Sequence, residues 1–405
     1  MKKFLNVALG IVTSIGGFLD VGSIATSAQA GAAFGFSLIW AIVLGTICVS
    51  FLVEMTGRLG AISKHTLGDA LRERFGAKFF MLPYLVEYVV DFLLLASEIG
   101  GVCIALQLAT GIGFRWWALP VALAVWLLLW RGTFGLIENG VASLGLVTLV
   151  FIAGSFALHP SLGAVVAGLL PSLPRHDMAH YLFIAVSIIG AVITPFLLYF
   201  YSSGAIEDKW SEDDLGTNRM VAGLGMSFGG MVSLGVLVVS GAVLFPRGIQ
   251  MDSYEQAVLA LVVPFGGWGF ALFIAALAVA CFGACLEVSL STAYLTAQGF
   301  GWNWGESQKP NQDARFSLVY TCNIFLASLL MLAGINPLQL TLFTMALIAT
   351  MLPVVVIPLL ILMNDKRYLH EYRNGWIANG VVVFVIVLTF VLALISIPLE
   401  ILGGS

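Results

Sequence analysis

The sequence predicts an all-α protein that crosses a lipid bilayer many times, and three observations support this prediction. Hydrophobic residues make up 60% of the 405 positions, while charged residues make up only 10%. Mean hydropathy is +1.01, whereas a soluble domain usually carries about 25% charged residues. Finally, the apolar runs are roughly twenty residues long, which is the length that a helix needs to cross a hydrocarbon core of about 30 Å.

Eleven such runs follow one another, and we expect each to form a membrane-spanning helix. They lie at residues 7–30, 35–57, 80–110, 115–131, 139–158, 178–208, 218–245, 259–298, 315–334, 337–363 and 375–400. The segment 62–78 is too polar to span and is expected to be a cytoplasmic connector with a short helix. The other polar connectors hold about fifteen residues at most, so no soluble catalytic domain is expected.

The first run resembles a cleavable signal peptide, because Met1-Lys2-Lys3 precedes it and Ala28-Gln29-Ala30 ends it. Asp20 and several Gly and Ser residues interrupt the run, however, and a signal sequence keeps its apolar region uninterrupted. We therefore expect the run to remain as a transmembrane helix.

Basic residues lie mostly on one side of the eleven runs. If the N-terminus is cytoplasmic, fifteen of the eighteen Lys and Arg residues fall inside, and three fall outside, namely Arg115, Arg175 and Arg247. Cytoplasmic loops carry an excess of Lys and Arg. We expect a multi-pass protein of the cell membrane with a cytoplasmic N-terminus and an extracellular C-terminus.

Two of the runs are interrupted near their centres. In the first, glycines flank Asp20, and in the sixth, Pro195 follows Gly190 and Ala191. Proline lacks a backbone N–H and clashes with the preceding turn, so carbonyls near Ala191 are expected to lose their helical partners and become cation ligands. A buried Asp20 would be costly unless paired or hydrated, and is by default a functional residue. The alternative, a structural ion pair, is less favoured because every Lys and Arg lies near the end of a run.

The positions of the breaks predict the topology. Breaks in the first and sixth helices fit two repeats of five helices, at about 7–158 and 178–363, with an eleventh helix at about 375–400. Inverted repeats whose broken helices meet at the midplane are typical of secondary transporters. We therefore expect one transmembrane transporter domain that carries a small cation by alternating access.

Three acidic residues share one face of the third helix, namely Glu87, Asp91 and Glu98. One interpretation is a hydrated path for ions or protons. The other is a structural network in which Glu87 and Asp91 pair with Arg315. Glu98 lies deeper in the span and is the better candidate for an ion or proton path.

Several stretches resemble the Nramp family of divalent-metal transporters. The resemblance starts with Asp20-Val21-Gly22-Ser23-Ile24-Ala25-Thr26 and continues through residues 29–32 and 34–40, while residues 190–196 with Tyr199 resemble the family's sixth-helix motif. Shorter similarities occur at 96–100, 289–292, 298–300, 352–353 and 357–359. The resemblance covers most of the chain and implies the LeuT-type fold, with helices one and six broken at the midplane.

The chain departs from that family at its ion site. The family has Asp-Pro-Gly-Asn in the first helix and Met-Pro-His in the sixth. Here Asp20 is kept, but the Pro, Asn, Met and His positions hold Val21, Ser23, Thr194 and Phe196. The expected metal ligands are Asp20, Ser23, Ala191 and Thr194.

These departures predict the substrate. A thioether favours soft transition metals, whereas a hydroxyl suits Mg²⁺, and shorter side chains leave room for the waters that Mg²⁺ keeps. The pattern is similar to that of the NRAMP-related magnesium transporters. We expect uptake of Mg²⁺, with Mn²⁺ as a second substrate.

Proton coupling through an intramembrane His is not expected. His is the side chain that titrates nearest physiological pH, and all five histidines fall in expected loops, namely His65, His159, His176, His180 and His370. We therefore expect a potential-driven uniporter, although Asp20 or Glu98 could still carry a proton.

Two other functions stay open: a proton-coupled Mn²⁺ or Fe²⁺ transporter of ordinary Nramp type and, less favoured, an amino-acid transporter of the LeuT fold. An enzyme is not expected, because no nucleophile with a base, no clustered His and Cys, and no phosphate loop occur. The expected partners are the divalent ion and the bilayer, with no cofactor, no nucleic acid and no obligate protein partner.

Overall fold

A computed structural model describes residues 20–131, 145–172, 174, 177–305 and 313–403, and all regular structure within these residues is helical. Its α-helices are α2 (Val21–Phe34), α3 (Ile39–Ser63), α4 (Leu67–Phe75), α5 (Ala77–Thr110), α6 (Phe114–Arg131), α8 (Leu149–Ala157), α9 (Leu162–Ala167), α10 (Met178–Val192), α11 (Pro195–Glu207), α12 (Leu215–Val243), α13 (Tyr254–Ala257), α14 (Leu259–Phe265), α15 (Gly267–Phe300), α16 (Ala314–Leu332), α17 (Pro337–Asn364), α18 (Lys366–Leu369) and α19 (Trp376–Gly403). Short 3₁₀ turns occupy η1 (Leu146–Thr148), η2 (Glu212–Asp214) and η3 (Phe245–Arg247).

The predicted spans match these helices closely. By length and composition, seven helical segments of the described chain can cross a membrane, and three shorter apolar helices accompany them. The third, ninth and tenth predicted runs, for example, correspond to α5, α16 and α17 with ends displaced by three residues or fewer. The parts of the first and fifth runs at 7–19 and 139–144 lie outside the described residues.

The single helix predicted at 259–298 is wrong, because the structure divides it into α14 and α15. Gly266, between them, has φ +58°, a left-handed conformation that glycine adopts without steric cost. Pro264 also lies within the last turn of α14. A chain that turns here can begin the long α15 in a new direction.

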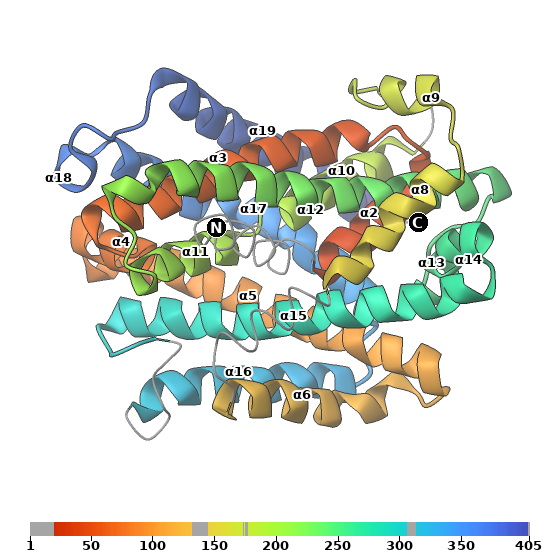
Figure 1. Ribbon diagram of the computed structural model, residues 1–405, viewed down its shortest axis with the longest axis horizontal. Helices are drawn as coiled ribbons and strands as arrows, with labels where there is room; N and C mark the ends of the chain where they lie inside the picture. Colours follow the sequence, from red (N-terminus) through yellow and green to blue (C-terminus); the bar gives the residue numbers. More distant parts are fainter. Residues whose placement is uncertain (1–19, 132–144, 173, 175–176, 306–312, 404–405) are drawn as a thin grey trace.

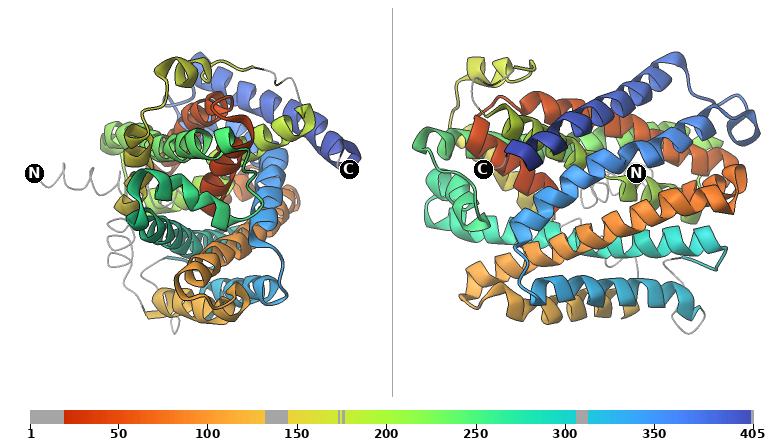
Figure 2. Two further views of the ribbon diagram at one scale, coloured as in Figure 1. Left: turned by 90° about the vertical axis from the view of Figure 1, so that its right-hand side faces the viewer. Right: turned by 180° about the vertical axis from the view of Figure 1, so that it is seen from behind.

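The long helices run side by side along the long axis of the molecule (Figures 1 and 2). Helix α5 packs against α15 and α17, α12 packs against α2 and α3, and α10 packs against α17. Helices α6 and α16 lie together along one edge, where both views show them adjacent. Helices from both expected repeats therefore build one bundle around α2, α5, α10 and α17.

The short helices mark the two ends of the bundle. Helices α4 and α18 lie at one end, and α13 and α14 lie at the other (Figure 1). The short helix predicted within the connector 62–78 is confirmed as α4, which Thr66 caps by accepting the N–H of Asp69 at 3.2 Å. At the same end, the Arg74 guanidinium pairs with Asp365 at 2.6 Å and so joins α4 to the start of α18.

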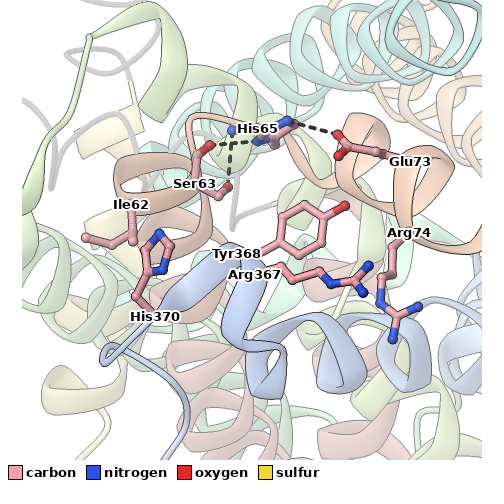
Figure 3. A pocket seen from close by; sticks show the side chains of 8 residues that line it. All are labelled: Ile62, Ser63, His65, Glu73, Arg74, Arg367, Tyr368 and His370. Atoms are coloured by element: carbon pink, nitrogen blue, oxygen red, sulfur yellow. Dashed lines mark hydrogen bonds and ion pairs between the residues drawn. The ribbon is translucent and has the colours of Figure 1, made fainter.

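A cavity of about 200 Å³ opens at this end between α3, α4 and α18 (Figure 3). His65 extends across its rim, with Nδ1 2.7 Å from the Ser63 carbonyl and Nε2 3.0 Å from Glu73. Its lining residues are Ile62, Ser63, His65, Glu73, Arg74, Arg367, Tyr368 and His370.

Candidate ion-binding site

Asp20 stands at the N-terminus of α2, in the middle of the first predicted span. Its backbone is extended, with φ −109° and ψ 176°, and its Oδ1 accepts the N–H of Ser23 at 2.6 Å. This is the geometry of an N-cap, which the short side chain of Asp favours. The side chain is only 2% exposed, so a negative charge is held inside the protein at the positive end of a helix.

Glu98 approaches the same point from α5. The backbone N–H of Val21 lies 3.1 Å from each carboxylate oxygen of Glu98 and donates to both. Two acidic side chains therefore satisfy N–H groups in the first turn of α2, groups that a helix cannot satisfy by itself. Sequence reasoning placed Glu98 deep in its span, and the structure brings it into direct contact with the residue after Asp20.

The predicted break in the sixth helix is present in the structure. Helix α10 ends at Val192, Ile193 and Thr194 are not helical, and α11 begins at Pro195. In a continuous helix the Ala191 carbonyl would accept a hydrogen bond from residue 195, but proline has no N–H to donate. The Ser23 hydroxyl lies 3.5 Å from the Ala191 oxygen, and this contact joins α2 to the end of α10.

Thr194 lies within this interruption, three residues after Ala191. It is the N-cap residue of α11, but its hydroxyl makes no capping hydrogen bond, and the residue is only 3% exposed. Of the expected ligands, Asp20, Ser23 and Ala191 are thus linked by direct contacts. Thr194 lies in the break between α10 and α11, and its hydroxyl does not cap α11.

The site carries two carboxyl groups, those of Asp20 and Glu98, and no Lys, Arg or His in the described part of the chain forms an ion pair with either. A structural ion pair for Asp20 therefore finds no support. Burying an isolated charge costs several kcal/mol. A bound cation would remove that cost, because it neutralises the carboxylates.

The expected ligands of the site are all oxygen atoms. Nowhere in the described residues do three or more His, Cys, Asp or Glu side chains gather closely enough to hold a metal. An ion beside Asp20 would therefore rely on the Ala191 carbonyl and on hydroxyl groups as well as on carboxylates. Such ligands suit hard cations.

Sequence reasoning missed Met345, which contacts both α2 and α10. Helix α17 packs against both α2 and α10, and the thioether of Met345 fills the space that a Cβ on Gly22 would need. The Met345 carbonyl similarly occupies the space beside Gly190. No motif around residue 345 marks it in the sequence, and only the packing of α17 brings its sulfur next to the residues that follow Asp20.

Glu87 and Asp91 do not pair with Arg315, so that part of the structural interpretation is wrong. Arg315 instead pairs with Asp313 at 3.3 Å, and its guanidinium lies 5.3 Å from the centre of the Trp302 ring. Asp313 caps α16 two residues before Arg315, so the local pair forms without any contribution from α5. The two acidic residues remain buried.

His180 is an exception to the prediction that the histidines lie in loops. Asp177 caps α10 by accepting the His180 N–H at 3.2 Å, so His180 falls in the first turn of that helix. His65, His159 and His370 are in connectors, and His176 lies outside the described residues. No described histidine lies in the break between α10 and α11.

Three comparisons identify relatives. The family model for natural resistance-associated macrophage protein-like (Nramp) proteins matches residues 10–398. The divalent metal cation transporter MntH of Nostoc sp. is 28% identical, with 92% of this chain and 86% of the relative covered. The MntH protein of Vibrio campbellii is 23% identical, with 96% and 91% covered.

Solved structures give the fold. A manganese transporter of Eremococcus coleocola superposes with a TM-score of 0.81 at 21% identity and covers 98% of this chain and 87% of its own. The LeuT-fold transporters Mhp1 and MhsT superpose with TM-scores of 0.62 and 0.63 at 16% and 14% identity, and each covers 96% of this chain. The predicted LeuT-type architecture is confirmed, and the chain belongs to the Nramp family.

Proposed function

We propose that the protein takes up divalent metal ions by alternating access, that Mg²⁺ is its main substrate and Mn²⁺ a second one, and that transport is driven by the membrane potential without proton coupling. The observation that carries the proposal is the junction of α2 with the end of α10, where buried Asp20 caps α2 and the Ser23 hydroxyl contacts the Ala191 carbonyl, which Pro195 cannot bond. The names of the MntH relatives and of the Eremococcus manganese transporter support a divalent ion.

Selectivity for Mg²⁺ rests on Thr194. A hydroxyl oxygen is a hard ligand, and a short side chain leaves space for water around an ion that loses water reluctantly. The proposed ligands are Asp20, Ser23, Ala191 and Thr194. All of their donor atoms are oxygens, which agrees with a hard cation.

Met345 favours the second candidate, a proton-coupled Mn²⁺ or Fe²⁺ transporter of ordinary Nramp type. Its thioether lies against Gly22, and a polarizable sulfur suits transition metals. If the sulfur reaches the ion, it would partly replace the softness lost at position 194. This contact is our reason for keeping Mn²⁺ as a substrate of the same site.

The absence of proton coupling is inferred from Phe196. This side chain follows the Thr194-Pro195 break and is buried, and it cannot titrate. Glu98, which binds the Val21 N–H, is the group through which a proton could still move.

The proposed topology has the N-terminus in the cytoplasm, the C-terminus outside, and two repeats at about 7–158 and 178–363 within one domain. It places the end of the bundle that holds α4 and α18 in the cytoplasm. The basic residues Arg74, Lys366 and Arg367 lie at that end, in keeping with the excess of Lys and Arg on the cytoplasmic side.

Transport into proteoliposomes tests the function. We would load vesicles with a magnesium dye and a pH dye and impose an inside-negative potential. Mg²⁺ entry without acidification is the expected result. Mn²⁺ entry with acidification, and no entry of Mg²⁺, would instead identify ordinary proton-coupled transport, while a chain that moves amino acids and ignores divalent ions would refute metal transport.

A further inference from the structure

A second group of polar residues lies apart from the Asp20 site, within the bundle. Glu87 and Asp91 are one turn apart on α5, and both are at most 1% exposed. Two neighbouring carboxyl groups this deeply buried are expensive to keep unless something compensates their charge.

Three other helices supply neutral oxygen atoms to the same place. From α15, the Thr292 hydroxyl lies 3.1 Å from Asp91 Oδ2. From α16, the Asn323 amide donates to Thr292 Oγ1 at 3.3 Å. From α11, which packs against both α15 and α5, Tyr199 adds a buried phenol oxygen near the two carboxyl groups. All three residues are fully buried.

Four oxygens of this group have no hydrogen-bond partner, although they are buried. They are Glu87 Oε1, Asp91 Oδ1, Tyr199 OH and Asn323 Oδ1. Buried polar atoms are nearly always satisfied in folded proteins. Four unsatisfied oxygens contributed by three helices point to a ligand that accepts electron pairs from oxygen.

The charge of the group indicates what kind of ligand this is. In the described part of the chain, no Lys, Arg or His forms an ion pair with Glu87 or Asp91. Two carboxylates balance one divalent cation. The ligand atoms are carboxylate, amide, hydroxyl and phenol oxygens, with no sulfur or ring nitrogen, and such a set suits hard ions such as Mg²⁺.

We propose that Glu87, Asp91, Tyr199, Thr292 and Asn323 form a second cation site, which holds the transported divalent ion between the Asp20 site and the end of the bundle that contains α4. Along α5, Asp91 and Glu87 lie about 10 Å and about 16 Å before Glu98, at 1.5 Å per residue. The inference rests on the proposed function only for the identity of the ion.

Counting bound ions tests this site. We would measure Mg²⁺ bound to the purified full-length protein in detergent by equilibrium dialysis at saturating Mg²⁺. The expected stoichiometry is two ions for the wild type, one for Asp20→Asn, one for the double variant Glu87→Gln with Asp91→Asn, and none for the triple variant. One ion in the wild type and none in Asp20→Asn would overturn the second site.

A conservative pair of variants keeps the test valid if the double variant does not fold. Tyr199→Phe in the Asp20→Asn background removes one proposed ligand oxygen and should weaken Mg²⁺ binding at least several-fold. Tyr201→Phe is the matched control, because Tyr201 lies on the same helix and also has an unpartnered buried hydroxyl, but its ring packs on Trp210. Equal affinity in Tyr199→Phe and Tyr201→Phe would contradict the proposal.

Two further results separate this site from the proposed function. Two bound ions in a wild type that transports no Mg²⁺ would refute Mg²⁺ uptake and leave the site standing. If the wild type transports Mg²⁺ but binds only one ion, the second site is refuted and transport stands. The same holds if Na⁺ binds at the cluster of Glu87 and Asp91 and Mg²⁺ does not. A wild type that binds no Mg²⁺ would refute both.

Discussion

At the scale of single residues, Asp20 combines two tasks that can be separated. It caps α2 through the Ser23 N–H, and its charge is proposed to bind the ion. Asparagine caps a helix about as well as aspartate, so Asp20→Asn should keep the fold and lose the charge. We expect Mg²⁺ transport to fall at least a hundredfold while the Tm changes little.

The measurement for Asp20→Asn is the initial rate of Mg²⁺ uptake at equal protein density in the vesicles. Asp252→Asn, an exposed carboxylate in the connector before α13, is the matched control and should transport like the wild type. Uptake by Asp20→Asn at the wild-type rate would mean that the ion binds elsewhere.

Thr194 and Met345 decide between hard and soft ions. Thr194→Met adds a thioether at the sixth-helix break and should raise the preference for Mn²⁺ or Cd²⁺ over Mg²⁺ about tenfold, which corresponds to about 1.4 kcal/mol.

Met345→Leu replaces the thioether next to Gly22 with an apolar side chain of similar volume. It should lower Mn²⁺ transport more than Mg²⁺ transport. Competition between the two ions for uptake measures both ratios, and an unchanged ratio in both variants would show that neither side chain contacts the ion.

At the scale of elements, the interruption between α10 and α11 depends on Pro195. Pro195→Ala restores an N–H that can bond the Ala191 carbonyl and close the break. Pro195 is the first residue of α11, a position where proline costs a helix little, so the Tm should change little. The variant should transport more slowly, since the carbonyl is no longer available to an ion.

Thermal unfolding and uptake measured on the same preparation check this prediction. Pro120→Ala, in the uninterrupted helix α6 and away from the site, is the control and should gain stability without losing transport. A Pro195→Ala protein that transports normally would mean that the Ala191 carbonyl takes no part in ion binding.

The elements were also the part of the structure that the sequence predicted best. Long apolar runs define α5, α16 and α17 because the bilayer requires about twenty apolar residues per span. The turn at Gly266 was missed, since the residues on both sides of it are equally apolar and hydropathy alone does not separate α14 from α15.

The site was predicted only in part, for a related reason. Asp20 and Pro195 stand out because a carboxylate and a proline are unusual in apolar helices. Met345 and Asn323 do not stand out, because a single methionine or asparagine in an apolar run resembles any packing residue. Their position beside charged groups follows from contacts between helices far apart in the sequence, and a local motif cannot show these.

At the scale of the whole molecule, the pair between Arg74 and Asp365 joins connectors from the two halves of the chain at the end expected to face the cytoplasm. The backbone N–H of Arg367 and then the Arg74 guanidinium hold the pKa of Asp365 below its usual value. A carboxyl group with a lowered pKa stabilises the folded state above the pKa that it has in the unfolded chain, and this contribution is lost as the pH falls through the folded value. Stability from this link should therefore be complete at neutral pH and fade below about pH 4, the ordinary range of Asp.

Asp365→Asn removes the charge and should lower the free energy of unfolding at pH 7 by about 1 kcal/mol, as is usual for an ion pair near the surface. Below about pH 4 the difference between the variant and the wild type should shrink progressively, because the carboxyl group then takes up a proton more readily in the unfolded chain than in the folded one. Tm measured against pH gives both values, with Glu371→Gln, an exposed carboxylate on the connector after α18, as the control. A stability difference that does not change with pH would show that the charge pair between the two connectors contributes nothing.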